Sequence, residues 1–201
     1  MLSNKNFHRI LRMIPNFLWP LKVIIVKFTI KAHGKNFKLG PKVLLYNYRG
    51  IEVGDNVFIG DGTTIGGNVP VTIGNNVMFG PEVMIRGGDH NISVVGLPMA
   101  KVKTGGVNLP ISIEDDVWIG TRAIILKGVI ISEGAVVGAG SIVNKKIYPY
   151  TINVGSPSKP LRSRFTRDDL KVHLASVKSK YSIEEIDDFY KKNSIEFRND
   201  K

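Results

Sequence analysis

Aliphatic residues recur every six positions along the middle of the chain. Twelve positions follow this spacing in three runs, and eleven of them are isoleucine or valine. They are Val53, Ile59, Ile65, Ile73, Phe79, Ile85, Ile113, Ile119, Ile125, Ile131, Val137 and Val143. A period of six matches neither an α-helix nor simple strand alternation. It indicates short strands joined by turns, so that three hexads make one triangular coil and the coils stack about 4.8 Å apart.

Stacked coils of this kind predict a parallel β-helix, an all-β solenoid whose core consists of β-branched side chains. The coils run from about Leu39 to Ile147, which gives roughly five of them. The spacing does not fix the hand of the coil. Glycine often comes directly after the aliphatic residue, where we expect it to tolerate unusual backbone angles. Small residues that we expect near the corners follow four positions after the aliphatic ones, as at Val117, Ala123, Val129, Ala135 and Ser141.

The repeat is interrupted at two places. Between Ile65 and Ile73 the step is eight residues, so Gly67-Asn68 is expected to be a small insertion at a corner. The second interruption begins with RGGDHNISVVGLPMAKVKTGG, and the spacing resumes only at Ile113. Long excursions from a compact domain are uncommon and usually functional. We therefore predict an arm over about residues 86–112 that leaves the coils at a corner.

The pattern divides the chain into three predicted regions. A basic apolar segment covers 1–34, the β-helix domain covers 35–155, and a proline-rich exit strand with helices covers 156–201. Two helices are expected after the exit strand. Thr166 and Ser182 each precede an acidic residue three positions later, which is typical of a capping box at a helix start.

Composition limits the chemistry. The chain has 201 residues, of which 43% are hydrophobic and 22% are charged, as in a soluble globular protein. The sequence contains no cysteine, which excludes disulfides, thiolate metal sites and cysteine nucleophiles. A signal peptide is not expected, because no small-residue cleavage site follows the apolar N-terminal stretch. These features favour a cytoplasmic protein.

The net charge of +11 is concentrated at the N-terminus, where the first fifty residues contain ten basic and no acidic side chains. Within this region, the apolar stretch from Phe17 to Ile30 is too short to span a bilayer. Two interpretations stay open. The stretch covers one end of the core, or it contacts an anionic membrane surface or a lipid-linked substrate, which would make the protein peripheral at the inner membrane. No nucleic-acid partner is expected, since no such motif is present.

The repeat, the arm with its GDH sequence, the coils VWIG and GAGSIV, and the exit NVGSPSKPLRSR together resemble the hexapeptide-repeat acyltransferases. Within that superfamily the chain resembles the galactoside, maltose and streptogramin O-acetyltransferases and their polysaccharide-modifying relatives. The resemblance covers about Gly50 to Arg164. It implies a left-handed β-helix, an exception to the usual right-handed crossover. It also implies acetyl-CoA as the acyl donor, no metal, and a homotrimer whose arms reach across to neighbouring subunits.

Acetyl transfer to a hydroxyl needs a base, and a neutral imidazole suits this role, contributing typically ~10²–10⁴-fold. His90 lies in the arm and is the only histidine between His33 and His173. It also matches the arm histidine that acts as general base in the resembled family. With no cysteine, and no serine paired with a histidine, direct attack on the thioester is the simpler mechanism. The group that orients His90 is open, because the adjacent Asp89, also a candidate substrate-binding residue, is equally suited to capping the turn.

The motif match gives six candidate coenzyme-binding residues: Thr121, Ala139, Asn144, Lys145, Lys159 and Arg162. The resemblance places the first two in the groove between neighbouring prisms and the next two further along it. The last two match basic residues that meet the coenzyme phosphates, where positive charge suits an anionic nucleotide. For the lysines, solvated surface charge is the alternative.

The positions expected to bind the acceptor depart from the pattern of the resembled family. Sugar-binding members carry an asparagine and an aspartate where this chain has Gly60 and Asn68, and the acidic residue near the end of the arm is missing from TGGVNLP. These departures argue against galactoside or maltose, although Asn68 remains a candidate substrate-binding residue. The acid-free N-terminus better suits a surface polysaccharide intermediate on a lipid carrier.

The sequence therefore predicts an O-acetyltransferase that modifies a saccharide hydroxyl in surface glycan synthesis. The alternative is N-acetylation of a nucleotide-linked amino sugar, for which losing His90 would have a milder effect. A γ-class carbonic anhydrase shares the repeat, but it needs three zinc-binding histidines and the repeat region of this chain has one.

Overall fold

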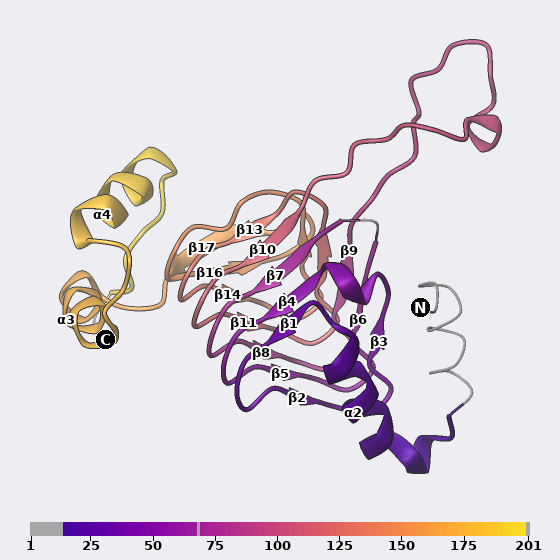
Figure 1. Ribbon diagram of the computed structural model, residues 1–201. Helices are drawn as coiled ribbons and strands as arrows, with labels where there is room; N and C mark the ends of the chain where they lie inside the picture. The colour runs from indigo at the N-terminus through magenta and orange to yellow at the C-terminus, as the bar shows by residue number, and fades with distance from the viewer. Residues whose placement is uncertain (1–13, 68, 200–201) are drawn as a thin grey trace.

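Three parallel sheets form the walls of a triangular prism (Figure 1). The computed structural model describes residues 14–67 and 69–199. The first wall contains β1 (Ala32–His33), β4 (Ile51–Val53), β7 (Val71–Ile73), β10 (Ile111–Ile113) and β13 (Ile130–Ile131). The second wall contains β2 (Lys38–Leu39), β5 (Phe58–Ile59), β8 (Met78–Phe79), β11 (Trp118–Ile119), β14 (Val136–Val137), β16 (Thr151–Val154) and β17 (Lys159–Ser163). The third wall contains β3 (Leu44–Leu45), β6 (Thr64–Gly66), β9 (Met84–Arg86), β12 (Ile124–Leu126) and β15 (Ile142–Val143).

As far as β15, each coil contributes one strand to each wall, so successive strands of a wall are three apart in chain order. The pairs are parallel and in register, as where Ile113 of β10 lies between Ile73 and Ile131. The final strand, β17, pairs antiparallel with β16. The fold is thus the left-handed parallel β-helix that was predicted, with about six turns instead of roughly five. The first coil begins at Ala32, ahead of Leu39, and β16 continues the stack beyond Ile147.

The predicted core positions lie inside the prism. All twelve hexad residues are at most 5% exposed, and most are fully buried. The five small corner residues from Val117 to Ser141 are 0% exposed. Stacked β-branched side chains fill this interior, and their removal from water is the main term that stabilises the prism.

The glycines after the hexad residues have a different role from the one expected. Gly120 is not among the residues with a positive φ, whereas Arg122, two positions later, has a φ of 58°. A Cβ atom at Gly120 would lie 2.6 Å from the backbone nitrogen of Ala139 in the next coil. Glycine is therefore required by the close approach of stacked backbones, and the left-handed corner residue is a separate position.

Helices cover both ends of the prism (Figure 1). At the N-terminal end a 3-10 helix, η1 (Asn16–Leu18), leads into α2 (Trp19–Thr29), and Val26 of α2 packs into the prism core. This packing agrees with the first of the two interpretations of the apolar stretch. No helix in the part of the chain that is described is long and apolar enough to cross a membrane. A further 3-10 helix, η2 (Tyr48–Gly50), connects β3 to β4.

At the C-terminal end, α3 (Arg167–Val177) and α4 (Ile183–Lys192) form a separate apolar cluster with Tyr150. The predicted helix starts are confirmed. The Thr166 side chain accepts a hydrogen bond from the backbone N–H of Asp169. Ser182 and Glu185 form a complete capping box.

The predicted arm lies between the end of β9 at Arg86 and the start of β10 at Ile111. It projects from the side of the prism as an extended loop (Figure 1). Its one helical turn is η3 (Met99–Lys101). Because η3 is so short, most backbone groups of the arm lack the regular pairing that holds the walls.

Candidate functional site

An open pocket of about 350 Å³ lies where the arm leaves the third wall. Its walls come from the arm root and from the ends of β12 and β15. The lining residues are Arg86, Gly88, Asp89, Leu126, Lys127 and Asn144. The pocket thus brings together two predicted site residues, Asp89 and Asn144, beside the predicted base.

A single ion pair ties the arm root to the prism. The Lys127 ammonium, just after β12, donates to the Oδ2 atom of Asp89. The backbone N–H of His90 donates to the Oδ1 atom of the same carboxylate at 2.9 Å. These contacts, led by that with Lys127, hold the pKa of the Asp89 carboxyl below its usual value. Asp89 therefore stays ionised near neutral pH and fixes the backbone on which His90 sits.

Glycine allows the two sides of the arm to meet at this root. Gly106 has a φ of +100°, which side chains other than glycine rarely adopt. A Cβ atom there would lie 2.5 Å from the carbonyl oxygen of Asp89. The segment that leaves the prism and the segment that returns to it therefore pass each other closely beside His90.

The His90 side chain itself is exposed. Among the described residues its imidazole makes no hydrogen bond, and Asp89 contacts the backbone of His90 instead of its ring. Asp89 thus positions the chain at the base without orienting the ring. Both ring nitrogens remain accessible to a group approaching from outside this chain.

Two of the predicted coenzyme-binding residues meet at one edge of the third wall. Thr121 follows β11 and Ala139 follows β14, on adjacent coils of the same corner. The backbone N–H of Gly140 donates to the carbonyl oxygen of Thr121 at 2.8 Å. Lys159 starts β17 opposite Val154, on the side of the second wall that faces this corner, and its side chain is exposed.

Asn144 and Lys145 lie at the opposite edge of the third wall, directly after β15, and both are exposed. The structure therefore separates five of the six predicted coenzyme-binding residues into two groups, with the width of the wall between them. The sixth, Arg162, is half-buried in β17, where its Nη1 atom donates to the carbonyl oxygen of Ser163 at 2.8 Å. Asn68 lies outside the described residues.

Between these two edges the outer face of the third wall carries a row of apolar side chains. Met84, Ile124 and Ile142 are in register on β9, β12 and β15. Met84 is 38% exposed and the other two are partly exposed. A long, thin ligand with one anionic end and one less polar end would find matching surfaces along this wall.

Lys127 was not predicted from the sequence. Its partner Asp89 lies 38 positions away, and nothing in the local sequence signals that contact. The one available signal is that the residue breaks the small and apolar composition of its coil, in IILKGV.

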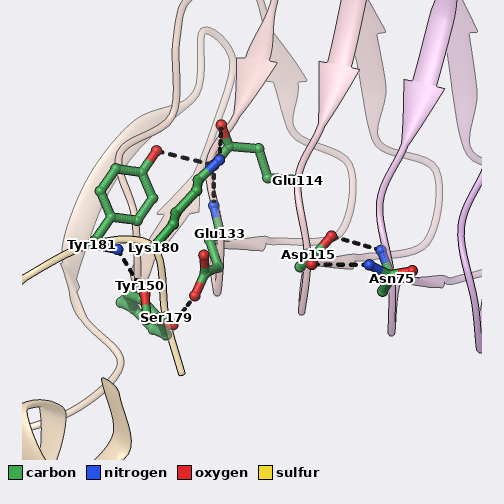
Figure 2. Close-up of polar contacts among 8 residues, drawn as sticks. All are labelled: Asn75, Glu114, Asp115, Glu133, Tyr150, Ser179, Lys180 and Tyr181. Carbon is green, nitrogen blue, oxygen red and sulfur yellow. Dashed lines mark hydrogen bonds and ion pairs between the residues drawn. The ribbon is translucent and has the colours of Figure 1, made fainter. Parts of the chain in front are cut away.

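A second polar cluster lies at the C-terminal end of the prism, and Figure 2 shows its contacts. Lys180 and Tyr181, between α3 and α4, both reach Glu114, with distances of 2.8 and 3.0 Å. The hydroxyl of Tyr150 donates to Glu133 at 2.5 Å, and burial is the main cause that raises the pKa of this tyrosine. These groups satisfy one another, so the cluster fastens the helices to the prism. No group of three or more histidine, aspartate or glutamate side chains in the described ranges is placed to hold a metal ion.

Comparison with known proteins places the chain among acyl-transferring relatives. The family described as hexapeptide repeat of succinyl-transferase matches residues 110–145. Galactoside O-acetyltransferase of Escherichia coli is 33% identical over 147 residues, which cover 72% of this chain and 69% of that protein. An acetyltransferase-named protein of Schizosaccharomyces pombe is 48% identical over 94 residues. That match covers 46% of this chain and spans only 42% of the relative's length.

Solved structures agree with this placement. A galactoside acetyltransferase in complex with coenzyme A has a TM-score of 0.71 and 28% identity, covering 83% of this chain and 81% of that one. A hexapeptide-repeat acetyltransferase of Vibrio cholerae in complex with acetyl coenzyme A has a TM-score of 0.69 and 26% identity, covering 80% and 84%. The repeat, the prism and these relatives lead to one conclusion: the chain belongs to the hexapeptide-repeat acetyltransferases.

Proposed function

We propose that this protein transfers an acetyl group from acetyl-CoA to a hydroxyl of a saccharide. One observation carries the proposal: the arm that holds His90 rises from the same wall whose two edges carry the expected coenzyme-binding residues. Donor and base would therefore meet at the arm root, beside the 350 Å³ pocket. Relatives named for galactoside acetylation favour a saccharide as the acceptor.

The reaction needs one proton to move twice. The neutral imidazole of His90 takes the proton of the acceptor hydroxyl while the hydroxyl oxygen attacks the thioester carbonyl. The carbon–sulfur bond then breaks, the acetyl ester is released, and the coenzyme thiolate receives the proton from the imidazolium. Such a route needs no acyl-enzyme, in line with the absence of cysteine from the sequence.

For the donor, we assign the phosphates to β17, which carries Lys159 at the corner beside Thr121 and Arg162 further along, opposite Ile152. The acetyl end would lie toward the arm root, near Asn144 and Lys145. The partly exposed row of Met84, Ile124 and Ile142 offers an apolar surface between the two. Cations at both edges suit a phosphorylated nucleotide, which is strongly anionic.

For the assembly, we propose a homotrimer with active sites between subunits. On the second wall Phe58, Met78 and Trp118 form an in-register outer row, 43, 53 and 52% exposed. On the arm, Ile92 and Leu97 are 71 and 53% exposed. Apolar groups left bare on both surfaces suit burial against another copy, and closed symmetric oligomers are the usual result of such contacts.

For the acceptor, we propose a surface polysaccharide intermediate on a lipid carrier. The pocket at the arm root has two cations, Arg86 and Lys127, and one carboxylate, Asp89. An acceptor with phosphate or carboxylate groups suits this charge. The Arg86 guanidinium lies over the ring of Tyr46 at 5.5 Å, and an anionic group of the acceptor would add a charged partner to this contact.

The test is an acceptor screen with the full chain and acetyl-CoA. Release of free thiol is followed over neutral sugars, uronic acids, amino sugars and lipid-linked sugar diphosphates. The product is then treated with mild base, because an ester is cleaved and an amide is not. Saccharide-dependent thiol release with a base-labile product is expected. A base-stable product that forms only on amino sugars would replace the proposal with N-acetylation.

A further inference from the structure

Four large apolar side chains lie bare on the outer face of the N-terminal helix. Phe17, Leu21, Ile24 and Phe28 are 81, 46, 51 and 86% exposed. Phe17 belongs to η1 and the others to α2, and their spacing of four, three and four residues places them on one helix face. Together they form a continuous apolar stripe, which we name the α2 stripe.

The α2 stripe does not hold the helix on the prism. That role belongs to the opposite face, where Val26 is 6% exposed and Lys22 is 9% exposed, followed by Ile30 at 7%. Trp19 adds to this contact, since its indole N–H donates to the carbonyl oxygen of Leu39 at 3.2 Å. A helix with apolar residues on two faces normally has a partner on both. Within the described ranges, only the inner face of α2 has one.

Charge around the α2 stripe indicates the kind of partner. The first acidic residue of the chain is Glu52, and ten basic residues precede it. Lys27 belongs to α2 and Lys35 lies on the exposed corner of the first coil, whereas Lys31, between them, forms an ion pair with Glu52 at 2.5 Å. Cations beside an apolar helix face are typical of segments that lie in the interface of an anionic membrane. A second copy would bring another basic N-terminus against this one, which like-charge repulsion disfavours.

We propose that the α2 stripe docks the protein on an anionic membrane surface. The helix lies flat, with the four apolar side chains among the lipid chains and Lys27 at the headgroup level. Figure 1 places α2 at the N-terminal end of the prism and the arm on its side, so docking leaves the arm free. This docking adds a partner to the proposed function and does not depend on acetyl transfer.

The experiment is co-sedimentation of the full chain with lipid vesicles, without acetyl-CoA or acceptor. One set contains phosphatidylcholine alone, and the other contains equal parts of phosphatidylcholine and phosphatidylglycerol. We expect binding to the anionic set, weakened at high salt because screening shortens the reach of the lysines. The Phe17→Ser/Phe28→Ser variant should bind at least about tenfold more weakly, since two large apolar side chains are lost.

A matched control is Val172→Ser/Val177→Ser, which removes two side chains that are 68 and 48% exposed on α3. It should bind like the wild type. All four positions are exposed, so both variants should keep the wild-type melting temperature and acetyl-CoA affinity.

Three results would overturn the docking proposal. The wild type would fail to bind anionic vesicles, or the Phe17→Ser/Phe28→Ser variant would bind them as well as the wild type. In the third, light scattering would show that this variant forms smaller species than the wild type although it still binds vesicles. That result would mean that the α2 stripe contacts a second copy of the chain. Because acetyl-CoA binding is measured separately on the same samples, each of these results leaves the acetyltransferase proposal standing.

Discussion

Apolar side chains in the prism and in the arm reach solvent to very different extents. Ile119 and Ile125 of the third repeat run are fully buried, whereas Ile92 and Val95 of the arm are 71 and 97% exposed. The prism is stabilised by its own stacked interior, and any change there acts on folding. The arm contributes little to that interior, so its sequence is free to serve another surface or a ligand.

The wall strands and the arm also differ in how they are held to the rest of the molecule. A wall strand such as β10 is paired in register on both sides. The arm root depends on the ion pair between Asp89 and Lys127 and on the close approach at Gly106. We therefore expect substitutions in the prism to act on stability and substitutions in the arm to act on chemistry.

The largest effect is expected at the proposed base. His90→Ala should lower acetyl transfer by ~10²–10⁴-fold, because the acceptor hydroxyl loses the group that takes its proton. Melting temperature and acetyl-CoA affinity should not change, since the side chain is exposed. His33→Ala, at an exposed histidine of β1, is the control and should retain full activity. Transfer within about threefold of wild type would contradict the role of His90.

The next effect is on folding and belongs to the prism. Ile119→Ala should lower the free energy of unfolding by about 2–5 kcal/mol, because it opens a cavity in the fully buried stack. The matched arm variant Val107→Ala, at a side chain that is 57% exposed, should change it by less than about 0.5 kcal/mol. Denaturant unfolding of the two variants measures both. Equal losses would mean that the arm belongs to the folding core.

A smaller effect is expected at the arm root. Lys127→Gln should lower kcat by about tenfold while changing stability by less than about 1 kcal/mol, because it frees the backbone that positions the base. Arg167→Gln breaks a comparable ion pair with Asp187 on the C-terminal helices and should leave turnover unchanged. If both variants lose activity equally, the effect is one of general destabilisation and Lys127 has no positioning role.

The smallest effect is a titration. Lys127 lowers the pKa of the Asp89 carboxyl, so this carboxyl should titrate below its ordinary value of 3.8. The contact is fully present above that value and is lost as pH falls through the lowered pKa. Carboxyl-carbon NMR of Asp89 measures the midpoint, and Lys127→Gln should return it toward 3.8. A wild-type midpoint at or above 3.8 would show that the ion pair does not form in solution.

The hexad period predicted the prism interior well, because each core position is filled by an aliphatic side chain from one chain segment. The same rule explains what it missed. Both residues of β1 are exposed, so the first strand of the first coil carries no aliphatic signal, and the repeat becomes visible only at Leu39 and Leu45. In β16 the buried positions are Thr151 and Asn153, which are polar, so the last turn is invisible to a search for isoleucine and valine.

For the site, the sequence located the arm and His90 because an interruption of a strict period is a local signal. It did not predict Lys127, because that contact joins a coil to the arm across 38 positions. Nor did it anticipate that the wall separates Thr121 from Asn144. Such separations depend on which corner of the prism each hexad occupies. The period alone does not specify which corner carries a ligand.

Calorimetric titration of the full chain with acetyl-CoA measures donor binding without any knowledge of the acceptor. We expect saturable micromolar binding at about one site per chain, weakened at least about tenfold in a Lys145→Ala/Lys159→Ala variant. Binding that is absent up to millimolar acetyl-CoA would contradict this expectation.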